Sequence, residues 1–452
     1  MKSGTFVNYQ LAEAILLLHE YNNFSSIDFN IALDGLKKKW KEDKIPSTGS
    51  PVPDLYNMQN ITFDELVKLD SKLDNYDTFT TENAANMQTI FKKSSNGEIE
   101  FDFSYLDPIL KLAKEKNKKV VIDSAIVFGD RYPEIFEGFS RDDLEPIIKE
   151  YIKKLADDYG DDIDRIDVLN AVFNRREIEE SYDESYDYKK DVEGFWIERF
   201  GDNYGKEIID ICKNSLGEKN IPLCWNEFYI TYPKFYDRKN KFLDMVGSID
   251  NLDIIGLQDT FRDSADSKET IDVLKEVEDQ CLKSSKEAAI TEFSCKISGE
   301  TTDYLKSVKD DPIELDNSRN KIEGRISRLM ENITNYVGQS KSFNSLEGRL
   351  SKEFDFNAYL PEVKEYNIDT VGYDWLKVVK PEKSYENLSE SHDKELEVMI
   401  SDSNTNSDIK EYNNEKNIES HGNELEVMIN ESISNSQNKQ TEAVNHKTYG
   451  SK

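Results

Sequence analysis

The chain has 452 residues, with 58 Lys and Arg against 90 Asp and Glu, and a formal net charge of −32. Such a charge repels phosphate, which argues against nucleic acid and against an anionic membrane surface as partners, whereas a neutral ligand is compatible with it. No stretch approaches the roughly 18 consecutive apolar residues of a transmembrane helix. The apolar run at 11–18 is interrupted by Glu13 and is followed by no cleavage site, so we expect a cytoplasmic protein without a signal peptide; secretion by another route stays open.

Histidine and cysteine are too few for several classes of catalytic site. Of the four histidines, only His19 precedes residue 390, so a Ser–His or Cys–His nucleophile or a His-rich metal site would depend on it. The four cysteines show no CxxC spacing, which favours reduced core thiols. We expect no metal and no cofactor.

Apolar, β-rich runs alternate with amphipathic stretches, such as 103–117 and 144–160, along residues 1–380. Apolar strands separated by helices predict a parallel sheet covered on both faces. Eight such strands predict an α/β fold of the (β/α)8 TIM-barrel type. A doubly wound open sheet is the alternative, but no glycine-rich phosphate loop follows any strand. The expected strands are 4–10, 76–83, 119–128, 163–170, 221–230, 252–258, 287–293 and 368–375.

Two segments do not fit one barrel repeat. Roughly 60 residues separate the first expected strand from the second, which predicts an insertion around 20–70. Residues 381–452 contain no Phe, Trp or Cys, and this composition predicts a disordered, acidic, low-complexity tail. ESHDKELEVMI at 390–400 returns as ESHGNELEVMI at 419–429. We interpret this ELEVMI duplication as a repeat without a specific partner; a pair of partner-binding helices is the alternative.

Polar side chains follow the expected strands at the ends where a barrel carries its functional groups. Each of them alone is more often a turn or helix cap. Together, amides and carboxylates suit the hydroxyl groups of a sugar, and the aromatic residues Phe128, Trp225, Phe228 and Tyr229 suit stacking on a sugar ring. The polar set is Glu82, Asn83, Ser124, Asn170, Asn226, Glu227, Gln258 and Glu292.

Five short motifs carry a resemblance to a known family. In chain order they are FTTENAANM (79–87), DVLNA (167–171), WNEF (225–228), GLQDT (256–260) and ITEFS (290–294). Their order and spacing resemble those of the family-10 glycoside hydrolases, the retaining β-1,4-xylanase type, over residues 75–300. The resemblance implies a TIM barrel that acts on a β-linked oligo- or polysaccharide.

Position by position, the resemblance implies that Glu292 is the nucleophile. Residues that bind the sugar beside the scissile bond would be Glu82, Asn83, Asn170 and Gln258, with Asn226 and Glu227 supporting them and Phe128 at an aromatic position. The chain departs from the family at Asn86, Ser124, Phe128 and Thr260. Above all, Ala171 stands where the family has its general acid/base glutamate.

A retaining glycosidase needs two carboxyl groups about 5–5.5 Å apart. Loss of the general acid costs on the order of 10²–10⁴ in rate. Another carboxylate could take the role, with Glu177, Glu179, Glu180 and Glu227 as candidates. The sequence therefore predicts a divergent xylanase-type hydrolase whose activity is retained, reduced or lost. The alternatives are a pseudoenzyme barrel that binds a carbohydrate or a protein partner, or an unrelated reaction if the resemblance is misaligned.

Overall fold

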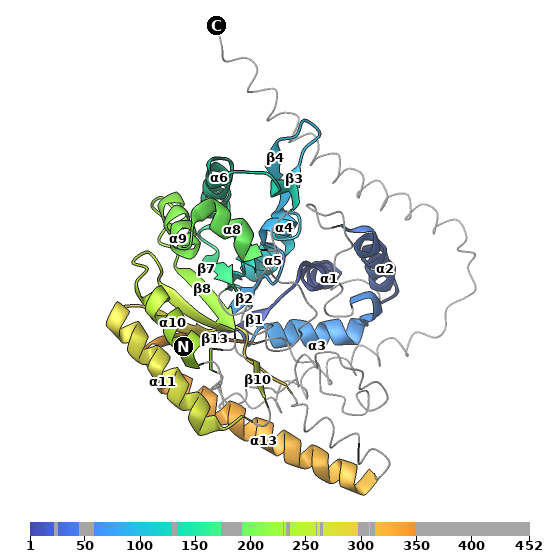
Figure 1. Ribbon diagram of the computed structural model, residues 1–452. Coiled ribbons are helices and arrows are strands. Elements are labelled where there is room, and N and C mark those ends of the chain that lie inside the picture. Colours follow the sequence, from blue (N-terminus) through green and yellow to red (C-terminus); the bar gives the residue numbers. More distant parts are fainter. Residues whose placement is uncertain are drawn as a thin grey trace, which may run out of the picture. The chain divides into compact units, whose positions relative to one another are not determined.

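A computed structural model describes residues 1–21, 26–44, 58–128, 134–172, 192–228, 230–231, 236–258, 260–262, 265–296, 307 and 312–348 (Figure 1). The chain divides into two units, Met1–Pro381 and Glu382–Lys452, and all the described residues belong to the first. The predicted tail with its duplicated segment and the candidates Glu177, Glu179 and Glu180 lie outside the described residues.

Eight parallel strands close into a barrel. They follow one another around it in chain order, β13 pairs back with β1, and β5 pairs with β7, so the ring has no open edge. This confirms the predicted (β/α)8 barrel. The strands are β1 (Lys2–Phe6), β2 (Thr78–Thr80), β5 (Lys119–Ile122), β7 (Ile163–Asn170), β8 (Leu223–Phe228), β9 (Ile254–Gln258), β11 (Glu287–Ile290) and β13 (Phe343–Gly348).

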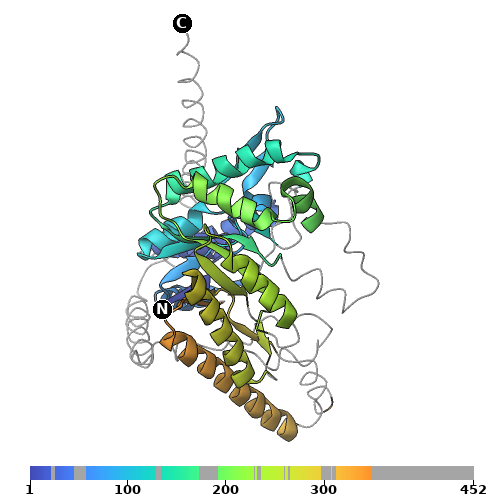
Figure 2. The ribbon, with the colours of Figure 1, turned by 60° about the vertical axis from the view of Figure 1, so that its left-hand side comes forward.

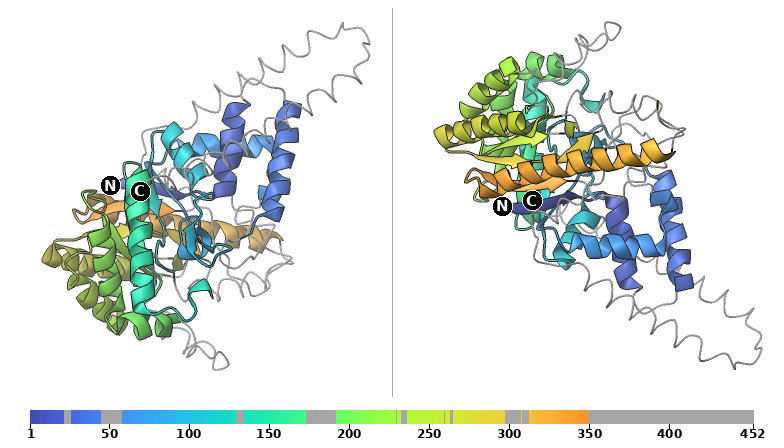
Figure 3. Two further views of the ribbon diagram at one scale, coloured as in Figure 1. Left: turned by 90° about the horizontal axis from the view of Figure 1, so that it is seen from above. Right: turned by 90° about the horizontal axis from the view of Figure 1, so that it is seen from below.

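Helices cover the outside of the barrel, and each described helix is too short or too polar to cross a bilayer. Figure 2 shows α11 and α13 side by side, and Figure 3 shows α1, α2 and α3, all between β1 and β2, gathered on another side. The helices are α1 (Tyr9–Glu20), α2 (Ser26–Glu42), η1 (Met58–Asn60), α3 (Phe63–Leu73), α4 (Met87–Ile90), α5 (Asp107–Glu115), η2 (Glu134–Phe136), α6 (Arg141–Tyr159), α8 (Val192–Phe200), α9 (Tyr204–Ser215), α10 (Tyr236–Gly247), α11 (Ser267–Ser284) and α13 (Pro312–Gln339).

Short strands complete the structure beyond the barrel walls. A hairpin of β3 (Phe91–Lys93) and β4 (Ile99–Phe101) follows α4, and β6 (Val127–Phe128) continues the wall beside the end of β7. Beyond the ends of β9 and β11, β10 (Thr260–Arg262) pairs with β12 (Ser294–Lys296).

The eighth strand is not the predicted one. The structure places it at β13, residues 343–348, whereas the predicted segment 368–375 lies outside the described residues. In β13 the inward positions carry Ser345 and Glu347, so the strand lacks the continuous apolar character by which the others were predicted. The predicted strand 119–128 is also broken, because a turn separates β5 from β6.

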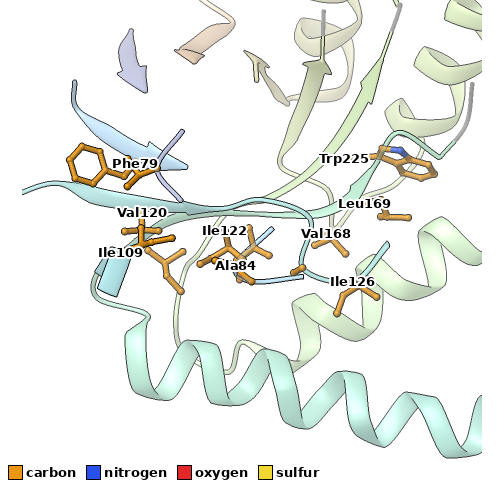
Figure 4. Close-up of a cluster of buried hydrophobic side chains, with 14 of the residues drawn as sticks. Phe79, Ala84, Ile109, Val120, Ile122, Ile126, Val168, Leu169 and Trp225 are labelled. Carbon is orange, nitrogen blue, oxygen red and sulfur yellow. The ribbon is translucent and has the colours of Figure 1, made fainter. Parts of the chain in front are cut away.

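The hydrophobic core lies between the outward face of the strands and the helices. Phe79, Val120, Ile122 and Val168 are fully buried there, as Figure 4 shows. Side chains alternate between the two faces of a strand, so the neighbours of Phe79, Val120 and Ile122 point into the barrel. In β7 a bulge between Asp167 and Leu169 interrupts this alternation.

The inside of the barrel is polar and charged. Arg165 on β7 donates hydrogen bonds to both oxygens of Asp167, at 2.7 and 3.2 Å, and to both oxygens of Glu347 on β13. Glu347 also accepts from the hydroxyls of Thr80, at 3.0 Å, and Ser345, at 3.1 Å. All five residues are buried. We call Arg165, Asp167 and Glu347 the ion cluster.

Gly4 packs against the ion cluster, and no larger residue fits in its place. A Cβ atom at Gly4, on β1, would overlap the side chain of Glu347 and come 2.6 Å from Thr78 Oγ1. We expect Gly4→Ala to lower the free energy of unfolding by about 1–3 kcal/mol, because it overpacks an interior without space. Urea unfolding followed by circular dichroism measures this.

Gly35, exposed in α2, is the matched control, because nothing lies within 4 Å of an added Cβ there. Gly35→Ala should stabilise the chain by about 0.5–1 kcal/mol, the usual gain in a helix interior. Equal effects at the two glycines would contradict the packing described for Gly4.

Candidate active site

The predicted site residues gather at one end of the barrel, because the carboxyl ends of parallel strands share one edge. Asn83, Ala171, Gln258 and Glu292 are half-buried, and we call these four residues the rim. Asn170 and Asn226 end the inner faces of β7 and β8, pair in register, and are buried; we call them the floor amides.

Each floor amide has one end engaged and one end without a partner. Asn170 Nδ2 donates to Asp123 Oδ1 at 3.1 Å, whereas Asn170 Oδ1 has no hydrogen-bond partner among the described residues. Asn226 Oδ1 accepts from Thr291 Oγ1 at 2.5 Å, and its Nδ2 is unpartnered within the described part of the chain. Buried polar groups without partners are rare, so these two atoms indicate a place where a ligand or water binds.

Glu292 is held by its two backbone neighbours. The Thr291 N–H donates to the Leu257 carbonyl at 2.9 Å, and the Phe293 N–H donates to the Glu347 carbonyl at 2.6 Å. These bonds tie the residue between β9 and β13, with Thr291 and Phe293 buried and Glu292 half-buried. A carboxylate fixed in this way at the end of a barrel strand is suited to attack a bound electrophile.

Gln258 ends β9 beside the last residue of β8, Phe228. Its Oε1 is buried and, among the described residues, has no hydrogen-bond partner. Two residues earlier, a Cβ at Gly256 would lie 2.8 Å from Cys224 Sγ and 3.0 Å from Asn226 Cα. The missing side chain therefore lets β9 approach the floor amide of β8 closely.

Three neighbouring strand ends carry left-handed backbone. Glu82 after β2, Ser124 after β5 and Ala171 after β7 have φ of 48°, 51° and 58°. For residues other than glycine this conformation costs about 1–2 kcal/mol each. Such strain persists where the surrounding structure imposes it, typically at functional sites.

Ala171 lies on the rim with its backbone fixed. Its N–H donates to the Asn226 carbonyl at 2.9 Å, and the next N–H, of Val172, donates to Glu227 Oε2 at 3.0 Å. Glu227 is fully buried. Its carboxylate thus supports the turn that carries Ala171, which favours a structural role for it over that of a replacement acid.

Burial and neighbouring charges perturb the carboxyl groups beneath the rim. Burial, then Asp167 and Glu292, raise the pKa of Asp123 well above its ordinary value of 3.8. Burial also raises the pKa of Glu347, although Arg165 opposes it. Burial disfavours the charged form of Arg165, but Asp167 and Glu347 outweigh it and raise its pKa. Arg165 is thus paired with two buried carboxylates, those of Asp167 and Glu347, and the raised pKa of Asp123 favours the protonated form of that carboxyl.

The remaining predicted residues belong neither to the rim nor to the floor amides. Asn86 caps α4, accepting from the Thr89 N–H and hydroxyl at 3.1 Å. The expectation that Trp225 stacks on a sugar is wrong: its ring is buried on the outer face of β8, against Phe242 and the space left by Gly205 (Figure 4). The Phe128 backbone pairs with Asn170. The side chains of Phe128, Phe228 and Thr260, and Tyr229 itself, lie outside what the structure describes.

Sequence reasoning missed Asp123 and the ion cluster. Asp123 directly follows the apolar run of β5, and Arg165 and Asp167 occupy alternate positions of β7. Polar residues at alternate positions of an otherwise apolar strand were the available signal, since they share the inward face.

A closed parallel barrel with carboxylates and amides at the carboxyl ends of its strands is the architecture of many hydrolases. The model of glycosyl hydrolase family 10 matches residues 55–338, more than half of the chain, and the chain belongs to this family. No curated protein matches the chain significantly.

Solved structures with similar folds are xylanases by their descriptions. A psychrophilic family-10 endo-β-1,4-xylanase is 14% identical, with a TM-score of 0.49, and the match covers 77% of this chain and 86% of that one. The endo-1,4-β-xylanase of Caldicellulosiruptor owensensis is 17% identical, with a TM-score of 0.46 and coverage of 82% and 91%. Penicillium canescens endo-1,4-β-xylanase is 15% identical, with a TM-score of 0.48 and coverage of 66% and 80%.

The raised pKa of Asp123 makes a prediction for stability. Above pH 3.8 this carboxyl ionises in the unfolded chain but stays protonated in the folded one, so its contribution to stability falls as the pH rises. Asp123→Asn removes the effect. We expect the free energy of unfolding of the variant, minus that of the parent, to increase from about pH 4 to pH 7, by at most about 1.4 kcal/mol per pH unit.

Asp161→Asn is the control for this titration. Asp161 is an exposed carboxylate whose pKa is lowered by Lys219, so it titrates mainly below pH 3.8 and its removal should leave the difference nearly constant between pH 4 and pH 7. A difference for Asp123→Asn that is independent of pH, measured by urea unfolding at several pH values, would show that Asp123 is not held protonated.

Proposed function

We propose that the chain is a retaining glycoside hydrolase of the β-1,4-xylanase type that has kept its nucleophile and lost its general acid. The position of Glu292 is the main support for a retained nucleophile. This residue is half-buried at the end of β11, tied to β9 and β13, and shares the rim with Gln258 above the floor amides.

In this proposal Glu292 attacks the anomeric carbon of a bound β-glycoside and forms a covalent glycosyl-enzyme. The bond to the leaving oxygen breaks at the same time, and that oxygen needs a proton. A second carboxyl normally supplies the proton and later takes one from the attacking water. Ala171 can do neither, so poor leaving groups such as a sugar alkoxide react slowly.

The other predicted residues bind the sugar. Asn170 and Gln258 have buried amide oxygens, without partners among the described residues, that can accept from hydroxyl groups. Glu82 and Asn83 come from the neighbouring end of β2. The net charge of −32 favours a neutral β-1,4-linked glycan over nucleic acid or an anionic membrane.

The second candidate is a barrel that binds a glycan without cleaving it. Two observations favour it. Ala171 has no acidic group, and Glu227, the one candidate replacement acid among the described residues, is already bonded to the Val172 N–H. The two candidates share the binding residues and differ in whether Glu292 still reacts.

Restoring the acid separates these candidates. Ala171→Glu adds no backbone strain, because alanine and glutamate are equally strained at φ 58°. We expect turnover of unactivated xylo-oligosaccharides to rise by about 10²–10⁴, the usual contribution of a general acid. Release of reducing sugar measures it.

Ala171→Gln is the control, since it has nearly the same shape but no proton to donate. Equal turnover in the two folded variants would contradict the proposal that the acid is the missing part. Binding of xylo-oligosaccharides by both, without turnover by either, would support the binding barrel.

A further inference from the structure

Asp123 lies beside the floor amides but outside the predicted set of site residues. It is a buried carboxyl, 5% exposed, at the turn between β5 and β6. No motif in the sequence pointed to it. Its Oδ1 accepts from Asn170 Nδ2 at 3.1 Å and from Ser124 Oγ at 3.4 Å. The bond to Asn170 joins it directly to a floor amide.

The position of Asp123 is fixed on both sides. Its own N–H donates to Thr81 Oγ1 at 3.1 Å, beside the end of β2. On the other side, the Ala125 N–H donates to the Asp167 carbonyl at 2.8 Å, and the Ile126 N–H donates to the Val168 carbonyl at 3.2 Å. The backbone of the turn is therefore attached to the end of β2 and to β7, which places the Asp123 carboxyl beside Asn170.

A carboxyl oxygen that accepts from two donors determines which way an amide points. The two ends of an asparagine amide have the same shape and opposite hydrogen-bonding character. Asp123 Oδ1 is an acceptor in either protonation state, since a proton can reside on Oδ2. Ser124 Oγ and Asn170 Nδ2 both donate to Oδ1, so the proton of a neutral Asp123 lies on Oδ2. In this arrangement only the NH2 end of Asn170 satisfies Oδ1, and the carbonyl end is left without a partner among the described residues.

At Asn226 the other end of the amide is engaged, by the hydroxyl of Thr291. This hydroxyl donates to Asn226 Oδ1, which leaves Nδ2 as the free end. Asn170 and Asn226 are register partners on adjacent strands, and such strands lie about 4.8 Å apart. The floor thus presents an acceptor on β7 next to a donor on β8.

We propose that Asp123 is a positioning residue that makes the floor selective for a hydroxyl group, by holding Asn170 with its carbonyl oxygen toward the ligand. A hydroxyl donates to Asn170 Oδ1 and accepts from Asn226 Nδ2 at once. A fluorine at the same place can only accept, and it would leave Asn170 Oδ1 buried without a donor. The inference rests on the proposed function, because it takes the ligand to be a sugar.

Calorimetric titration of the full chain tests this with xylobiose and its series of monodeoxyfluoro analogues. The parent should bind at least one analogue about tenfold or more weakly than xylobiose, since a site built to pair with a hydroxyl rejects its replacement. Asp123→Leu keeps the bulk of residue 123 but offers no acceptor, so Asn170 can take either orientation. That preference should then shrink to within about threefold, while xylobiose still binds.

Asp107→Leu is the matched control. Asp107, in the first turn of α5, is another carboxyl whose pKa is raised by burial, and it accepts from the Tyr159 hydroxyl at 2.7 Å. This variant should keep the full preference for the hydroxyl. A general loss of stability would weaken all ligands alike and would leave the ratio unchanged.

The outcomes distinguish the two proposals. If the parent binds no xylo-oligosaccharide, the proposed function fails and this inference fails with it. If xylobiose binds but no analogue is rejected, or if Asp123→Leu keeps the full preference, only the role of Asp123 is overturned.

Discussion

Arg165 reaches across the inside of the barrel, because the guanidinium that Asp167 holds on β7 is also bound by Glu347 on β13. These two strands are not neighbours; β8, β9 and β11 lie between them in the ring. Removing one partner of such a buried pair costs about 3–5 kcal/mol, since it leaves an uncompensated charge. The residues around this contact leave space for it. Gly4 has no side chain, and Glu347 occupies the place that a Cβ atom would take.

The ion cluster also connects the two sides of the candidate site. The backbone of Glu347 holds the segment that carries Glu292, through the Phe293 N–H. The backbone of Asp167 holds the turn that carries Asp123. Burial and the charges of Asp167 and Glu292 raise the pKa of Asp123, and the Oδ1 of this carboxyl accepts from the Asn170 amide. Scaffold and site are therefore parts of one network.

The sequence predicts a barrel strand well where its residues are mostly apolar, and poorly where polar residues face the inside of the barrel. The bounds of β7 agree with the predicted 163–170, and the strand order follows from the alternation of strands and helices. The eighth strand was misplaced, because Ser345 and Glu347 interrupt its apolar run and their partner, Arg165, is distant in the sequence. Asp123 was missed for a related reason: its partner, Asn170, is distant in the sequence. Trp225 was misassigned because its character fits either face of a strand.

The most direct test is the turnover of an activated aryl β-xylobioside by the full chain, with and without azide, beside Glu292→Gln. Such a leaving group needs little protonation, and azide can react with the glycosyl-enzyme without the general base that Ala171 lacks. A working nucleophile without its acid predicts slow turnover that azide accelerates and that Glu292→Gln abolishes. Turnover that azide leaves unchanged, or that survives in Glu292→Gln, or no turnover at all, would contradict it.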